Sequence, residues 1–102
     1  MISQDDRRRA PRLPFGRLLE EGLLTPGENL FFDADRGRSA VVLADGALLA
    51  GPVMGSIHLV GRHFAGGSPC NGWEHWFYES EAGELRPIDH LREELRAATR
   101  AE

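Results

Sequence analysis

The stretch from Asn29 to Leu49 reads NLFFDADRGRSAVVLADGALL. Within it, Asn29–Phe32 and Ser39–Leu43 are short apolar runs on either side of a polar loop, a pattern that predicts two strands. Asp45-Gly46 is the dipeptide most typical of a tight hairpin turn, and Ala47–Leu49 supplies the returning strand. The stretch therefore predicts three consecutive antiparallel strands.

Helical patterns flank these strands. Leucines after residue 14 predict a short helix over about residues 15–21, which ends at Gly22. Ser56 has the position of an N-cap. It precedes a predicted helix whose apolar side carries Ile57, Val60 and Phe64.

The aromatic run Asn71–Glu79 is predicted to be a further strand, followed by a C-terminal helix that Asp89 caps. The expected order is α-β-β-β-α-β-α, an α+β fold in which two to three helices pack a small antiparallel sheet. The strand would carry on one face Trp73, His75 and Phe77, and on the other Trp76 and Tyr78. The apolar stripe of the last helix would be Ile88, Leu91, Leu95 and Ala98.

The length of 102 residues fits one small domain. Residues 1–12 are polar and show no apolar periodicity, so we expect an arginine-rich arm or linker there and a folded domain over residues 13–102. No apolar run reaches the roughly 18 residues that span a bilayer, and the start lacks the pattern of a secretory signal. We therefore expect no membrane contact. The single cysteine, Cys70, fits a reducing compartment, so we expect a cytoplasmic location.

The formal net charge is −4, whereas free-standing nucleic-acid binders ordinarily carry a basic patch. All 12 positive charges are arginine, a composition that a GC-rich genome also produces. Arginine does bind phosphate and guanine through two N–H groups at once. Charge alone therefore leans mildly against nucleic acid without excluding it.

Motifs of several enzyme classes are absent from the sequence. It holds no Gly-x-Gly-x-x-Gly loop, no Walker A loop, no His-Glu-x-x-His and no paired Cys-x-x-Cys. His58 and His63 lie on one predicted helix and point about 140° apart, so they do not share a metal ion. No aspartate or glutamate stands at a spacing from Cys70 and His75 that is typical of a group orienting a catalytic histidine. We therefore expect neither a metal site nor a Cys–His nucleophile, and Cys70 is expected to be a small buried residue.

Four side chains remain as candidates for ligand contact, each with a structural alternative. Ser56 is either a helix cap or, with the free N–H groups beside it, a phosphate ligand. Asn71 is either a turn residue or a donor to a phosphate or a base edge. Trp73 is either part of the core or a partly exposed stacking surface. Arg92 belongs either to a solvated, ion-paired helix face or to a ligand site that its packed stem serves.

Several short motifs follow one another in a distinctive order. They are Pro14-Phe15-Gly16, Gly22–Glu28, Ala44-Asp45-Gly46, Gly55–His58, Pro69–Trp73 with Trp76, and Pro87–Arg92. In this order they resemble the C-terminal domain of the cell-cycle-regulated adenine methyltransferases, which modify adenine in GANTC sites, and related modules attached to restriction and methylation proteins. The resemblance covers about residues 12–100, and its most specific pair is Gly-Ser-Ile-His and Cys-Asn-Gly-Trp.

The resemblance implies a DNA-binding accessory domain in which Ser56, Asn71, Trp73 and Arg92 contact DNA, either double-stranded or locally opened. The family's catalytic Asp-Pro-Pro-Tyr and its glycine motif for S-adenosylmethionine do not occur here. The chain is therefore expected to bind no cofactor, while a methyltransferase catalytic domain, its partner, uses S-adenosylmethionine. The chain is then either an excised domain or a free-standing relative. The alternative function is a protein-interaction or dimerisation module built on the aromatic strand, and a homodimer stays open.

Overall fold

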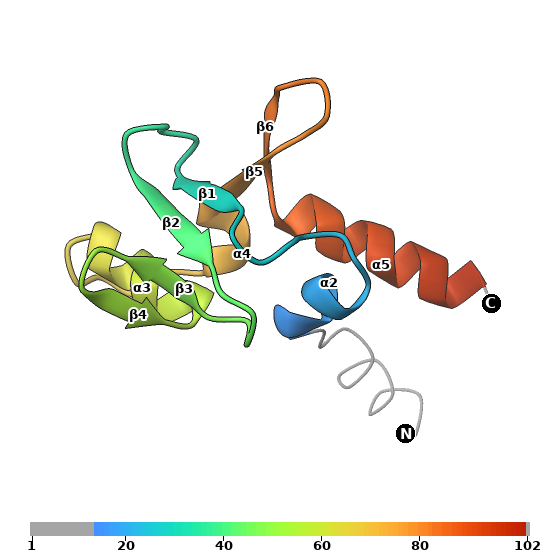
Figure 1. The fold of residues 1–102 in the computed structure, drawn as a ribbon, viewed down its shortest axis with the longest axis horizontal. Coiled ribbons are helices and arrows are strands. Elements are labelled where there is room, and N and C mark those ends of the chain that lie inside the picture. Colours follow the sequence, from blue (N-terminus) through green and yellow to red (C-terminus); the bar gives the residue numbers. More distant parts are fainter. Residues whose placement is uncertain (1–13, 102) are drawn as a thin grey trace.

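The computed structural model describes residues 14–101, and side chains to residue 98, as one antiparallel sheet with helices packed on it (Figure 1). The sheet has six strands in the order β4-β3-β2-β1-β5-β6. In chain order they are β1 (Asn29–Phe32), β2 (Ser39–Val42), β3 (Leu48–Ala50), β4 (Val53–Gly55), β5 (Trp76–Glu79) and β6 (Leu85–Pro87). Each strand pairs antiparallel with its neighbours, and β1 joins the two halves of the sheet through β2 and β5.

The described residues form four helices: α2 (Gly16–Glu20), α3 (Ile57–Phe64), α4 (Gly72–His75) and α5 (Asp89–Ala101). Helix α3 contacts β3 and β4, whereas α5 contacts α2 and β6 at the other end of the domain (Figure 1). The one-turn helix α4 lies between these groups and touches α3, β5 and β6. The α+β prediction is confirmed, with one helix more than the expected two or three. No helix among these residues is long and apolar enough to cross a bilayer.

Alternation along the central strands places one set of side chains in the core. Leu30 and Phe32 on β1 and Ala40 and Val42 on β2 are buried, while their neighbours face outward. Trp76 opens β5 with none of its surface exposed, and its indole N–H donates to the carbonyl of Ile57 at 2.9 Å. The buried indole thus meets both its packing and its hydrogen-bond requirement.

Local signals correctly predicted the turn at Gly46 and the cap of α3. Gly46 has φ +89° in the turn between β2 and β3, as the Asp-Gly pair predicted. Ser56 caps α3, because its hydroxyl oxygen accepts the backbone N–H of Leu59 at 3.0 Å. The first helix is also confirmed, and Gly22 follows it with φ +78°.

Three expectations at the level of elements were wrong. The run 71–79 is not one strand, because 72–75 form α4 and only 76–79 form β5. Trp73 and His75 therefore do not share a strand face with Phe77. Strands β4 and β6, of three residues each, were missed because such short segments show no periodicity.

The C-terminal helix also differs in detail. Asp89 is its first helical residue and forms an ion pair with Arg92, so it does not act as the predicted cap. Ile88, Leu91 and Leu95 are buried as expected, but Ala98 is exposed. The predicted arm, residues 1–12, lies outside the described residues and stays a prediction.

Candidate functional site

One pocket of about 600 Å³ opens where five separate segments of the chain meet. The segments are the start of α2, the β2–β3 turn, the start of α3, helix α4 and helix α5. The lining residues are Pro14, Phe15, Gly16, Asp45, Gly46, Ser56, Ile57, His58, Trp73 and Arg92. All ten fall within the motif runs identified in the sequence, although those runs are spread over nearly the whole chain.

The starts of α3 and α4 are locked together at the back of this pocket. A Cβ on Gly72 would lie 2.7 Å from the backbone of Ile57, so glycine is required for this approach. The backbone N–H of Gly72 donates to Nδ1 of His58 at 2.9 Å. These contacts join the Gly-Ser-Ile-His and Asn-Gly-Trp motifs in space.

Trp73 forms part of the pocket wall and does not project from it. Only 6% of its surface is exposed. The ring of Phe15 meets it edge-on, with centroids 6.1 Å apart. The guanidinium carbon of Arg92 lies 4.4 Å from the centroid of the Trp73 ring, a cation–π contact. A ligand therefore reaches this tryptophan only from within the pocket.

Arg92 has a more constrained side chain than a solvated helix face would give. Its side chain is 20% exposed, it forms an ion pair with Asp89, and its head lies over Trp73. One turn further on, Arg96 pairs with Glu93. Both arginines are thus partly neutralised by the carboxylate three residues before them. Arg92 is the one of this pair that lines the pocket.

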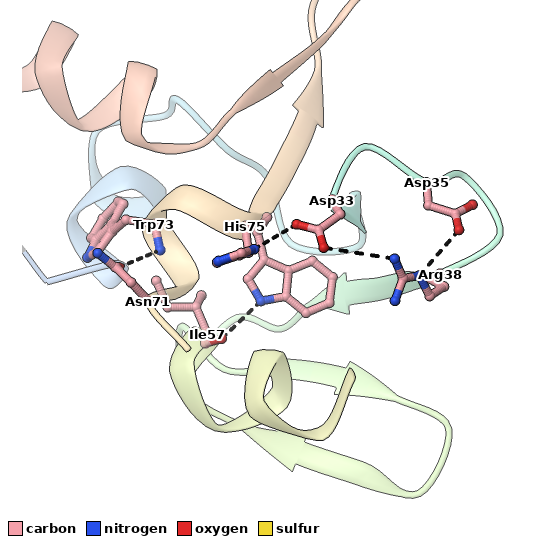
Figure 2. A network of polar contacts seen from close by, with 8 residues as sticks. Asp33, Asp35, Arg38, Ile57, Asn71, Trp73 and His75 are labelled. Carbon is pink, nitrogen blue, oxygen red and sulfur yellow. Dashed lines mark hydrogen bonds and ion pairs between the residues drawn. The ribbon is translucent and has the colours of Figure 1, made fainter. Parts of the chain in front are cut away.

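Ser56 and Asn71 are both N-caps, of α3 and α4 respectively. Asn71 accepts the backbone N–H of Trp73 through Oδ1 at 3.1 Å (Figure 2). Capping occupies an acceptor on each side chain but leaves a donor, the hydroxyl proton of Ser56 and the amide N–H₂ of Asn71. The structural and ligand-binding interpretations of these residues are therefore compatible.

The structure brings three of the four predicted site residues, Ser56, Trp73 and Arg92, into one pocket. Asn71 is exposed beside it and is absent from the lining. Sequence reasoning missed Phe15, Asp45 and His58 as lining residues. All three stand in the quoted motif runs, so motif membership could have indicated them, whereas residue type alone could not.

A second polar network joins the β1–β2 loop to the end of α4 (Figure 2). Nδ1 of His75 lies 2.7 Å from Oδ1 of Asp33, and Arg38 bridges Asp33 and Asp35. Asp33 and Ala34 have φ of +53° and +60°, which this network and the bond from Asp33 N–H to the carbonyl of His75 help to hold. None of these residues lines the pocket, so we assign the network a structural role.

Cys70 has the environment of a packing residue. It is partly buried against the core, and burial, with smaller contributions from Asp33 and Glu74, raises the pKa of its thiol. A raised pKa disfavours the thiolate that a nucleophile needs. Among residues 14–101, no group of three or more His, Cys, Asp or Glu side chains is placed to hold a metal ion.

The model of the family Restriction Enzyme Adenine Methylase Associated, RAMA, matches residues 3–101. The chain therefore belongs to the RAMA family, a group of accessory domains associated with adenine methylases.

Proposed function

We propose that this chain is a non-catalytic DNA-contacting domain of an adenine-N6 DNA methyltransferase, and that its pocket holds the DNA backbone. The observation that carries the proposal is the convergence of separate motif runs on a single pocket. The pocket adds affinity and orientation, and a separate catalytic domain performs the chemistry. On the resemblance of the motif runs, we propose that this catalytic domain uses S-adenosylmethionine and acts on GANTC sites.

The pocket offers hydrogen-bond donors suited to a phosphodiester. Arg92 supplies a permanently charged guanidinium, and Ser56 supplies its hydroxyl proton. Because Nδ1 of His58 accepts the N–H of Gly72, the ring proton of neutral His58 resides on Nε2. Asn71, just outside, supplies an amide N–H₂. Donors outnumber the one carboxylate in the lining, Asp45, whose Oδ1 already accepts the N–H of Ala47.

The apolar part of the wall suits the non-ionic parts of a nucleotide. Phe15, Ile57 and Trp73 present carbon and aromatic surface beside the donors. Sugar and base atoms bind such surfaces by van der Waals contact and stacking. We assign Trp73 the role of a pocket wall against which the edge of a nucleotide packs, in place of a partly exposed stacking surface.

Titration of a fluorescently labelled GANTC duplex at low salt, followed by anisotropy, tests the proposal. Arg92→Ala should weaken binding about 10- to 100-fold, since hydrogen bonds to charged groups contribute about 1.5–3 kcal/mol. Trp73→Phe should weaken it less, because phenylalanine keeps a ring but is a poorer cation–π partner. Arg86→Ala is the matched control, since Arg86 lies on β6 outside the pocket lining. Equal affinity for wild type, Arg92→Ala and Trp73→Phe would remove the proposal.

Sequence preference gives a second arm of this experiment. Phosphate contacts position a protein on DNA but carry no direct sequence information. The chain should therefore bind GANTC and scrambled duplexes with affinities within about threefold of each other. A strong preference of the isolated chain for GANTC would show that the chain recognises bases directly. It would contradict the proposal that the pocket holds only the DNA backbone.

Protein docking is a second candidate function, favoured by a different observation. The large exposed hydrophobic residues of the described part are Leu49, Met54 and Leu59. Leu49 and Met54 are cross-strand partners on β3 and β4, and the segment 46–61 contains no charged residue. Both tryptophans of the aromatic run predicted for this role are buried, so docking would use the uncharged surface of β3 and β4 instead. Dimers in sedimentation velocity that Met54→Arg dissociates would support it, and a monomer at every concentration would remove self-association.

A further inference from the structure

Asn71 and Gly72 form the dipeptide in which asparagine loses its side-chain amide most readily. In this reaction the backbone nitrogen of the glycine attacks Cγ of the asparagine, because glycine has no Cβ to hinder the attack. A new C–N bond closes a five-membered succinimide ring. The side-chain amide nitrogen takes up the proton of the glycine N–H and leaves as ammonia. Water then opens the ring at either carbonyl carbon and yields aspartate or isoaspartate.

The backbone of Asn71 holds the two reacting atoms apart. Its ψ of 103° turns the nitrogen of Gly72 toward the Hα side of the Asn71 Cα. Closure of the succinimide ring requires that nitrogen to lie on the side of Cβ. A large rotation about the Cα–C bond of Asn71 must therefore precede the reaction.

Two hydrogen bonds and one close backbone contact oppose this rotation. The N–H of Gly72 donates to Nδ1 of His58 at 2.9 Å, so the rotation would break this bond. Oδ1 of Asn71 accepts the N–H of Trp73 at 3.1 Å, which holds the side chain that would be attacked (Figure 2). Gly72 is buried against Ile57 and has no room even for a Cβ. The peptide bond therefore stays in place while α3 and α4 remain in contact.

We infer that Asn71-Gly72 is a modification site that the fold keeps closed: the chain deamidates there when α4 separates from α3, and the change is irreversible. Helix α4 has only four residues. Release of so short an element is a local opening, which costs less free energy than global unfolding. The reaction would then convert a reversible opening of the pocket wall into a permanent chemical change. This inference goes beyond the proposed function and does not depend on DNA.

The two products differ in whether α4 can form again. Aspartate is as good an N-cap as asparagine, and its carboxylate can accept the N–H of Trp73. Isoaspartate adds a methylene to the main chain just before Gly72, and its former side-chain carbonyl becomes part of the backbone. Because Gly72 has no spare room against Ile57, the isoaspartate chain should not restore the contact between α3 and α4. Both products replace an amide beside the pocket by a carboxylate, which repels a phosphate if the proposed function is correct.

Deamidation of the full chain in mildly alkaline buffer, with and without guanidinium chloride, tests the inference. Asn71 is the single asparagine of the tryptic peptide 63–92, in which the Arg86-Pro87 bond resists cleavage, so mass spectrometry follows it alone. Its rate should be at least about 10-fold slower in the native chain, because the reaction must wait for α4 to open. Asn29 is the internal reference and should change little in either condition, because Leu30 hinders the attack.

Substitutions at His58 test the source of the protection. His58→Ala should raise the native rate toward the denatured rate, because the N–H of Gly72 loses its acceptor. His58→Asn should keep most of the protection, since Oδ1 of asparagine can accept in place of Nδ1. His63→Ala is the matched control on the same helix, because the ring of His63 contacts Phe64, and it should leave the native rate unchanged. Circular dichroism shows that each variant is folded.

Equal rates at Asn71 in the native and denatured wild type would overturn the inference, as would an Asn71 that remains intact in guanidinium chloride. A native rate unchanged by His58→Ala would overturn the assignment of the protection to the contact between α3 and α4. After removal of the denaturant, the aspartate product should regain the native circular dichroism spectrum and the isoaspartate product should not. Duplex binding by Asn71→Asp tests the proposed function separately. Wild-type affinity in that variant would remove Asn71 as a DNA contact and would leave the deamidation result as it stands.

Discussion

The guanidinium of Arg92 on α5 lies over the indole of Trp73 on α4, 4.4 Å from the ring centroid. The contact connects the C-terminal helix to the motif that caps α4, and both residues line the same pocket. A ligand that draws the guanidinium toward a phosphate must compete with the indole and with Asp89. The contact therefore fixes where the guanidinium of Arg92 lies before a ligand binds.

This arrangement predicts that Arg92→Ala is a clean binding mutant. A cation–π contact and a partly exposed ion pair together contribute about 1–2 kcal/mol. The variant should remain folded, with its free energy of unfolding in urea lowered by no more than about 2 kcal/mol. A loss above about 4 kcal/mol would mean that Arg92 holds the fold, and DNA-binding data from this variant would then report unfolding.

Gly72→Ala should be strongly destabilising. The added Cβ would lie 2.7 Å from the carbonyl carbon and oxygen of Ile57, which are backbone atoms and cannot rotate away. We expect a loss of at least about 2 kcal/mol in urea denaturation. Gly16→Ala is the control, because a Cβ there meets nothing within 4 Å and alanine favours a helix. An unchanged midpoint for Gly72→Ala would contradict the close approach of α3 and α4.

Ser56→Ala should lower stability by about 1 kcal/mol through loss of the N-cap bond to the N–H of Leu59. It should also weaken DNA binding, because the substitution removes the hydroxyl proton that would donate to a phosphate. Ser68→Ala, in the exposed loop after α3, should change neither quantity. Thermal unfolding and anisotropy titration of both variants measure the two effects. Normal stability for Ser56→Ala would show that its hydroxyl does not cap the helix.

Cys70 should react slowly with iodoacetamide in the folded protein. Burial raises the pKa of its thiol above the ordinary value, with Asp33 and Glu74 adding to the effect. Because the folded state holds this proton more tightly, the linked stabilisation is complete below the unfolded pKa and is lost as pH rises through the folded pKa. Alkylation rates of native and urea-unfolded chain across the alkaline range measure the difference. A native rate equal to the unfolded rate would contradict the raised pKa.

The sequence predicted those features that depend on neighbouring residues. Asp45-Gly46 indicated the hairpin, Ser56 indicated its helix, and both were confirmed because each signal arises within a few residues. The alternating aromatics of 71–79 misled, because Asn71 caps a single helical turn that carries too few residues to show a period. Trp73 consequently lies in a pocket wall instead of on a strand.

The pocket could not be predicted from the sequence, because it depends on how distant segments pack together. Ser56, Trp73 and Arg92 were singled out one by one, but their meeting depends on how α3, α4 and α5 pack. The bond between His58 and the backbone of Gly72 is a long-range contact that no local pattern encodes. The motif runs include all the residues that line the pocket, but they do not indicate how those residues are arranged.

The two tryptophans of the chain provide the most direct test of the pocket as the DNA contact. The indole of Trp73 lines the pocket, whereas that of Trp76 is fully buried and bonded to the carbonyl of Ile57. Their N–H resonances give two reporters in one proton–nitrogen NMR spectrum, recorded while duplex is added. The Trp73 resonance should move progressively with DNA, and that of Trp76 should move much less. Saturable binding that leaves the Trp73 resonance in place, with the shifted amides on another face, would contradict the central claim.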